Sequence, residues 1–346
     1  MLYATTRNKN DVETAYRAIH LDCNADGGLF VPLRFPQYTQ EQIAAMAERT
    51  FGQNVADVLN AFFSCNLTGW DVEFAVGRIP VKINMIPHRI LIAECWHNSQ
   101  WRFDRVVQML SDRLRTENAG VVASNWVNVA VRIAVLFGIY GILLNSDQID
   151  GKTALDVAVT AGDFASPMAA WYAREMGLPI GGIVCGCNAN GAAWDLLHRG
   201  EMSTGGVAVK TATKDADIVV PRNLERLIGA VMGPDEVNKF VDCCHNGATY
   251  ALRDEQLELL RKGIFAAVIS DMRVENSIYS VSRTSGYVLS PYSALAYASL
   301  LDYRAKTGES RTALLFTERS PVCDVEQVAA YMRVDVPMVF RRLGSK

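Results

Sequence analysis

The feature that most limits how this chain can fold is a long apolar run, VNVAVRIAVLFGIYGILLN, from Val127 to Asn145. Its length approaches that of a membrane-spanning helix, but Arg132 interrupts it and no second run accompanies it. Half of the 346 residues are apolar, which is enough to build a substantial core. The run therefore predicts a buried helix of a globular protein.

Strand-like and helix-like segments alternate on both sides of this run. The strand candidates are Ile90–Ala93, Ala154–Val159, Ile183–Cys187, Phe265–Ser270 and Ala313–Thr317, and the helix candidates are Phe103–Arg115 and Pro167–Met176. Such alternation favours an α/β fold with a largely parallel sheet. We expect an N-terminal region at residues 1–92 and a main α/β domain at residues 93–346.

Net charge and cysteine usage limit the classes of partner, the cellular compartment and the metal sites that we expect. A net charge of −3 provides no basic field for nucleic acid or an anionic membrane surface. Eight scattered cysteines and the lack of a secretory signal favour a reducing cytoplasm. Cys185, Cys187 and Cys243–His245 offer soft ligands for zinc, but no CxxC spacing occurs, so we expect no metal site.

Several motifs follow one another along the chain. They are YATTRN (Tyr3–Asn8), DGGLFVP (Asp26–Pro32), Glu94 with His97, the long segment Val157–Glu201, Asp215–Leu227 and Ser285–Tyr297. In this order they resemble the threonine synthases, which are pyridoxal-phosphate (PLP) enzymes. The resemblance implies the tryptophan synthase β-like fold, fold type II, in which a three-layer parallel sheet has helices on both faces.

The same resemblance exposes a change at the catalytic position. In the family a lysine that forms a Schiff base with PLP follows a phenylalanine, shortly after a Glu-x-x-His-Gly-Pro segment. Here Glu94, His97 and Phe103 match, Asn98 and Ser99 replace Gly-Pro, and Asp104 stands where the lysine should be. A carboxylate cannot form an imine.

The family's phosphate-binding loop also differs. Ser-Gly-Asn-Phe-Gly is replaced by Ala161–Ala165, in which Gly162, Asp163, Phe164 and Ala165 are the candidate cofactor-binding residues. Asp163 adds a negative charge where an anion would sit, and Ala165 replaces a flexible glycine. The alternative is that Gly162 and Asp163 form a turn and cap the helix that starts near Pro167, without any ligand.

Two further family elements are altered. The Ser-Gly-Asp-Thr-Gly loop for the substrate carboxylate is absent, and only a short remnant near residues 104–124 precedes Asn125–Asn128, so the small cofactor-covering domain is expected to be largely deleted. The hydroxyl that meets the pyridine nitrogen corresponds to Glu318 when Pro321 is the anchor. A one-residue shift of the alignment would place Thr317 there instead.

These changes predict a noncatalytic threonine synthase-like protein that acts as a binding or regulatory scaffold, without PLP. One alternative is a PLP-dependent lyase that uses a relocated lysine, for which Lys82, Lys152 and Lys210 are candidates. Another is a small-molecule sensor, or a regulatory subunit that forms a hetero-oligomer with an intact threonine synthase. In that case an apolar surface for the partner could be formed by Trp96, Trp101, Trp126 and Tyr140; the alternative is that these side chains fill the core. A homo-oligomer is also compatible with this prediction.

Overall fold

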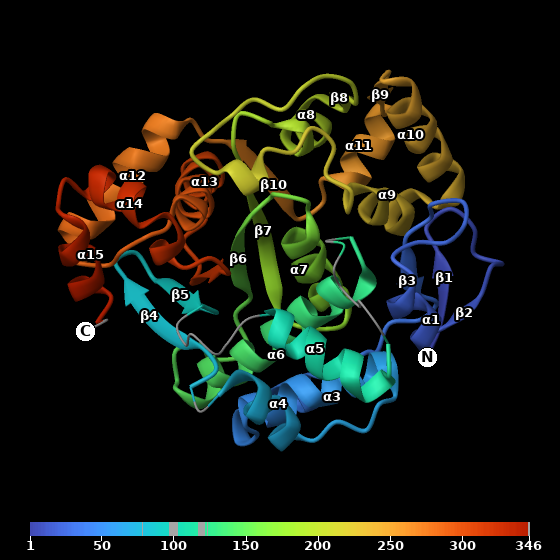
Figure 1. Ribbon diagram of the computed structural model, residues 1–346, viewed down its shortest axis with the longest axis horizontal. Coiled ribbons are helices and arrows are strands. Elements are labelled where there is room, and N and C mark those ends of the chain that lie inside the picture. Colours follow the sequence, from blue (N-terminus) through green and yellow to red (C-terminus); the bar gives the residue numbers. More distant parts are fainter. Residues whose placement is uncertain (78, 97–102, 117–121, 123, 345–346) are drawn as a thin grey trace.

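The computed structural model describes residues 1–77, 79–96, 103–116, 122 and 124–344 (Figure 1). The strands are β1 (Leu2–Thr5), β2 (Glu13–Thr14), β3 (Phe30–Pro32), β4 (Lys82–Ile86), β5 (Ile90–Glu94), β6 (Leu155–Thr160), β7 (Ile180–Cys187), β8 (Glu201–Ser203), β9 (Thr249–Ala251), β10 (Ile264–Val268) and β11 (Ala313–Thr317). The α-helices are α1 (Ala15–His20), α2 (Gln40–Ala44), α3 (Phe51–Phe63), α4 (Gly69–Val76), α5 (Phe103–Leu114), α6 (Trp126–Asn145), α7 (Ala165–Glu175), α8 (Ala192–Arg199), α9 (Leu224–Met232), α10 (Pro234–Asn246), α11 (Asp254–Leu260), α12 (Asp271–Thr284), α13 (Pro291–Thr307), α14 (Val325–Met332) and α15 (Val336–Arg342). Short 3₁₀ turns are η1 (Ala45–Glu48), η2 (Lys214–Ala216) and η3 (Pro321–Asp324).

A six-stranded sheet with the order β10-β7-β6-β11-β5-β4 forms the centre of the molecule. Neighbouring strands are parallel, except that β4 pairs antiparallel with β5. Residues 87–89 connect these two strands, a link too short for a parallel crossover, and His88 and Arg89 take the left-handed φ values of 68° and 57° that a tight hairpin needs. The predicted α/β fold is confirmed, with one antiparallel edge strand.

Helices cover both faces of this sheet. Along β11, Leu314 and Phe316 point into a core shared with α3, α6 and α7, whereas Ala313 and Leu315 point into a core shared with α12, α13 and α14. In Figure 1 the helices α12 to α15 gather on one side of the sheet. The three-layer arrangement follows from strands that are apolar on both faces.

The long apolar run forms α6, which contacts α3 on one side and α7 on the other. Asn125 caps it, because its side-chain oxygen accepts a hydrogen bond from the Val127 N–H at 2.9 Å. Among the described helices, α6 is long and apolar enough to cross a membrane by length and composition, yet most of it is buried inside the protein. It is the buried core helix that the sequence predicts.

The first 92 residues do not form a core of their own. Tyr3, Phe30 and Phe62 belong to the same buried cluster as Trp126 of α6 and Phe316 of β11. The Tyr3 and Trp126 rings make an edge contact with centroids 6.2 Å apart, and the Tyr3 hydroxyl donates to the Phe62 carbonyl at 2.9 Å. Residues 1–92 and 93–346 therefore share one hydrophobic interior.

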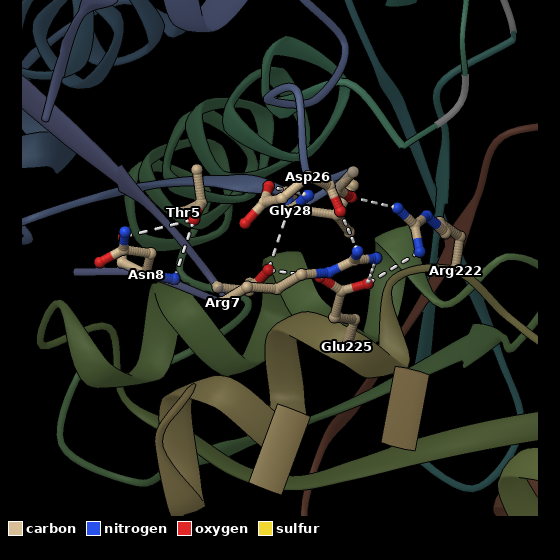
Figure 2. A network of polar contacts seen from close by, with 10 residues as sticks. Thr5, Arg7, Asn8, Asp26, Gly28, Arg222 and Glu225 are labelled. Carbon is tan, nitrogen blue, oxygen red and sulfur yellow. Dashed lines mark hydrogen bonds and ion pairs between the residues drawn. The ribbon is translucent and has the colours of Figure 1, made fainter. Parts of the chain in front are cut away.

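A polar network fixes the N-terminal segment to α9 (Figure 2). Arg7 Nε lies 3.1 Å from Glu225 Oε1, and Arg222 Nη1 lies 2.8 Å from Glu225 Oε2. The Thr6 hydroxyl also donates to Glu225, at 2.5 Å. Since the Glu225 side chain is fully buried, this cluster of one carboxylate, one hydroxyl and two guanidinium groups holds strand β1 and helix α9 together.

Candidate functional site

A cavity of about 910 Å³ opens at the carboxyl ends of β5 and β11. Ligands of α/β proteins bind at this edge of a parallel sheet, and the volume is in the range of small-molecule sites. The strand ends, the first turn of α5, the loop before α13 and the end of α15 form its wall. The side chains that line it include those of Lys82, Asn84, Glu94, Asp104, Tyr287 and Glu318.

Helix α5 brings Asp104, the residue predicted to replace the family's lysine, to this cavity. Asp104 is the second residue of the helix and lines the cavity wall beside Phe103. The Phe103 ring packs against Phe316 at a centroid distance of 5.9 Å, which fixes the start of α5 against the end of β11. His97, Asn98, Ser99 and Trp101 lie outside the described residues, as do residues 117–121 and 123 of the expected remnant 104–124.

A partly buried ion pair lies beside the cavity. Arg132, the one charged residue in the apolar α6, places Nη2 2.6 Å from Glu318 Oε2, and its Nε is 3.1 Å from Glu318 Oε1. Its Nη1 donates to the Asn128 carbonyl at 2.8 Å, and its guanidinium lies 4.7 Å from the Phe103 ring centroid. Burial alone would lower the pKa of Arg132, but Glu318 outweighs it, so the pKa is raised.

The Glu318 carboxylate also meets the first turn of α7. Ser166 donates its hydroxyl to Glu318 Oε1, and the same hydroxyl accepts from Arg132 Nε at 3.2 Å. The place of Glu318 opposite a pyridine nitrogen stays a prediction; in the structure its carboxylate contacts the first turn of α7. Sequence reasoning missed Arg132 and Ser166, although a lone arginine in an apolar helix signals a buried partner.

The loop before α7 is a turn, as the ligand-free alternative describes. Gly162 and Phe164 have left-handed φ values of 47° and 70°, and the Phe164 N–H donates to the Ala161 carbonyl at 2.7 Å. The Asp163 carboxylate accepts from the Ala165 N–H at 3.0 Å, so α7 starts at Ala165, two residues earlier than expected. Burial raises the pKa of Asp163, while Arg132 opposes this rise.

A second carboxylate, Glu94 at the end of β5, is buried in the cavity wall. Asn84 donates to Glu94 Oε1 at 2.6 Å, and Lys82 Nζ lies 4.0 Å from Oε2. Burial raises the pKa of Glu94, an effect that Lys82 and the Tyr287 hydroxyl reduce. Of the three candidate lysines, Lys82 lines the cavity, whereas Lys152 and Lys210 are exposed elsewhere and do not.

The aromatic residues considered as a partner surface fill the core instead. Trp126 and Tyr140 are 0% and 1% exposed. Trp126 makes edge contacts with Phe35, Phe62 and Tyr172. Trp96 is half-buried at the cavity, where its indole N–H donates to the Thr317 hydroxyl at 3.1 Å. Core filling is therefore correct for Trp126 and Tyr140.

Cys185 and Cys187 are buried along β7, and burial raises the pKa of both thiols. Cys243 and Cys244 lie on α10, which packs against α9. Within the described part of the chain, no group of three or more His, Cys, Asp or Glu side chains is arranged to hold a metal ion.

Sequence comparison finds distant relatives. Residues 2–76 match the family model "Threonine synthase N terminus". Threonine synthase-like 1 of Homo sapiens is 26% identical over 178 residues, which cover 50% of this chain and 24% of that protein. Threonine synthase of Pseudomonas aeruginosa is 25% identical over 194 residues, which cover 55% of this chain and 39% of that protein. The matches thus span less than half of each relative's length.

Structural comparison extends the likeness to the whole chain. A PLP-bound threonine synthase from Brucella melitensis superposes with a TM-score of 0.85 at 18% identity, covering 100% of this chain and 95% of that one. Threonine synthase from yeast gives a TM-score of 0.82 at 15% identity, covering 96% and 90%. These similarities establish the fold, because identity at this level does not carry activity with it.

Proposed function

Because the chain is a distant member of the threonine synthase family, we propose that it is a noncatalytic member that serves as a ligand-binding scaffold. The observation that carries this proposal is Asp104. Helix α5 places this residue on the cavity wall, next to Phe103, and the resemblance to the family assigns the Schiff-base lysine to the same position. A carboxylate cannot supply the amine on which PLP chemistry depends.

The residues present do not fit PLP. Its phosphate needs N–H donors at the start of α7, yet the Ala165 N–H is bound to the Asp163 carboxylate and the Phe164 N–H to the Ala161 carbonyl. The Glu318 carboxylate contacts Ser166 in the same turn. Two negative side chains beside the expected phosphate oppose its binding.

A scaffold role agrees with what the site retains. The cavity keeps the volume of a small-molecule site and has both charged and apolar walls. We include in the proposal a cytoplasmic location and assembly with itself or with an intact threonine synthase. Size-exclusion chromatography tests the assembly, with the protein run alone and mixed with the organism's threonine synthase. If neither sample contains a species larger than the monomer or the intact enzyme, the proposed assembly is wrong.

The second candidate is a PLP-dependent enzyme that uses Lys82. The observation in its favour is that Lys82 is the lysine among the described residues lining the cavity. Its ammonium group lies 4.0 Å from the buried Glu94 carboxylate, and its side chain is 48% exposed, whereas a lysine that forms an imine is usually desolvated in its site. This exposed setting is the reason why Lys82 remains second.

One experiment separates the two. The purified protein is mixed with pyridoxal phosphate, dialysed, and examined for the visible absorbance of a lysine-bound cofactor and for a mass increase after borohydride reduction. The noncatalytic proposal expects neither signal in the wild-type protein. A stable adduct would overturn it; loss of that adduct in Lys82→Met, with retention in the exposed control Lys152→Met, would assign the chemistry to Lys82.

A further inference from the structure

A second cavity, of about 340 Å³, lies at the other edge of the sheet. It is lined by His88, Arg89, Leu301, Arg304 and Ser310. The first two residues belong to the hairpin between β4 and β5, the next two lie in the C-terminal half of α13, and the last precedes β11. Because β5 and β11 both begin here, this is the amino edge of the sheet, whereas the larger cavity opens at the carboxyl edge.

The charged side chains of this cavity lack an anionic partner. None of the described residues that line it is an aspartate or a glutamate. The half-buried Arg304 donates from Nη1 to the His88 carbonyl and from Nη2 to the Arg311 carbonyl, both at 2.7 Å. Its Nε is buried and has no hydrogen-bond partner in the part of the chain that the structure describes. Two neutral carbonyls therefore use only some of the donors of this guanidinium.

The carboxylates at this edge are engaged by a different arginine. Arg311 Nη2 lies 3.2 Å from Asp156 Oδ1, and Arg311 Nε lies 3.3 Å from Glu309 Oε2. The Arg89 side chain is exposed and makes no ion pair or hydrogen bond with another described residue. Burial lowers the pKa of Arg304, Asp156 opposes this effect, and the charge of Arg89 adds to it. Arg89 and Arg304 are thus close enough to repel each other.

The hairpin holds its two cavity residues in a strained conformation. His88 and Arg89 have left-handed φ values of 68° and 57°, which side chains with a Cβ rarely adopt and which turns normally assign to glycine or asparagine. The bond from Arg304 to the His88 carbonyl and the bond from the Ala313 N–H to the Arg89 carbonyl, at 3.0 Å, keep this conformation. Strain of this kind concentrates at ligand sites, and here it places an arginine beside a cavity.

The carbonyl end of α13 opposes an anion at this edge, but its effect is reduced. The Tyr303 carbonyl accepts from the Thr307 hydroxyl at 2.7 Å, and the Arg304 carbonyl accepts from the Gly308 N–H at 2.9 Å. The last turn also carries two cations, Arg304 and Lys306, which offset the negative end of the helix dipole.

We propose that Arg89, Arg304 and Ser310 form a binding site for a small oxyanion of the phosphate class at the amino edge of the sheet. The anion supplies the partner that the two guanidinium groups lack within the described chain, and the Ser310 hydroxyl adds a neutral donor. Leu301 gives the cavity an apolar wall, so it has room for free phosphate or for a phosphate monoester with a short apolar group. This site is separate from the cavity that contains Asp104 and does not depend on the function proposed for it.

The test is a calorimetric titration of the full chain with inorganic phosphate, at constant ionic strength adjusted with sodium chloride. We expect wild type to bind one phosphate per chain. Arg89→Met removes the exposed guanidinium and keeps a long side chain, so it should bind phosphate at least about tenfold more weakly, because a charge-assisted contact is lost. Arg304→Gln should weaken binding to a similar degree. A parallel titration with propyl phosphate identifies the form of the ligand: tighter binding than inorganic phosphate indicates a monoester on Leu301, and weaker binding indicates free phosphate.

Arg333→Met is the matched control. Arg333 is also exposed and has a left-handed φ of 56°, but it lines neither cavity. Its replacement should change the affinity for phosphate by less than about twofold. Absence of phosphate binding in wild type, or equal binding by wild type and Arg89→Met, would overturn the inference. An equal loss in Arg333→Met and Arg89→Met would also overturn it, since it would indicate attraction by net charge alone.

A second measurement guards against loss of folding. Arg304 holds the hairpin, so Arg304→Gln is checked by circular dichroism, and Arg89→Met decides alone if that variant does not fold. Phosphate should raise the melting temperature of wild type more than that of Arg89→Met, and equal shifts would contradict the site. Because inorganic phosphate has no aldehyde, this result is independent of whether a lysine of the protein reacts with pyridoxal phosphate.

Discussion

Two ion-pair clusters in this protein contain the same chemical groups in different surroundings. Each has one glutamate, one hydroxyl and at least one arginine: Glu225 with Thr6, Arg7 and Arg222, and Glu318 with Ser166 and Arg132. The Glu225 side chain is fully buried and is bound by two arginines, whereas that of Glu318 is 23% exposed and has one.

The setting of each cluster explains the difference. The Glu225 cluster joins β1, in the segment that matches the family model, to α9, and it is absent from the cavity lining. The Glu318 cluster lies where the strands end and opens on the cavity. A glutamate–arginine cluster therefore joins two segments of the chain where its carboxylate is fully buried, and stays partly exposed where it borders a cavity.

The largest effect is expected at the locked cluster. Glu225→Gln leaves the mostly buried Arg7 and its neighbour Arg222 without their carboxylate, and should lower the free energy of unfolding by about 3–5 kcal/mol. Urea denaturation followed by circular dichroism measures this value. A loss below about 1 kcal/mol would show that the cluster does not hold the N-terminal segment.

A smaller loss is expected at the cavity cluster. Arg132→Met removes the cation from Glu318 and Asp163, but Glu318 can regain water through the cavity, so we expect about 2–3 kcal/mol. Adding Glu318→Gln should restore part of this loss, which a double-mutant cycle from the same denaturation curves reveals. If Arg132→Met costs more than Glu225→Gln, the contrast between the clusters is wrong.

The pH dependence of stability offers a third test, through Asp163. Its pKa is raised in the folded protein, so its protonated form is favoured there. Relative to Asp163→Asn, wild-type stability should be highest below the ordinary pKa of 3.8 and should fall as the pH rises through the raised value. Denaturation of both proteins between acidic and neutral pH measures the difference; a relative gain with rising pH would contradict this sign.

The smallest effect is expected for an arginine–carboxylate pair on the surface. Arg273 binds Asp302 through two bonds, but the two side chains are 42% and 34% exposed. Asp302→Asn should therefore cost no more than about 1 kcal/mol. This variant sets the baseline against which the two buried clusters are compared by thermal or urea unfolding.

Much of the fold could be predicted from local patterns. The strand Ala313–Thr317 has the predicted limits, and α6 begins one residue before the predicted run Val127–Asn145 and ends at the same residue. The antiparallel direction of the edge strand β4 was not predicted. It depends on the short hairpin to β5, and the alternation of strands and helices does not specify strand direction. Helix α7 begins earlier than expected because Asp163 caps the Ala165 N–H.

The site was harder to predict, since its residues are distant in the chain. The sequence indicated that Asp104 replaces an amine and that Asp163 and Glu318 alter the cofactor positions. It did not indicate that Glu318 and Ser166, 152 residues apart, would bond to each other. Nor did it show that Lys82, rather than Lys152 or Lys210, would reach the cavity, because that depends on which strand forms the sheet edge.

The sequence by itself determined that α6 is a core helix with a single charged residue, Arg132, because the apolar pattern is a local property. Only the tertiary structure decided that Arg132 pairs with Glu318, 186 residues away at the end of β11. The reason is physical: strand order brings the end of β11 beside α6 and α7, and the free energy of a buried ion pair depends on that spatial approach.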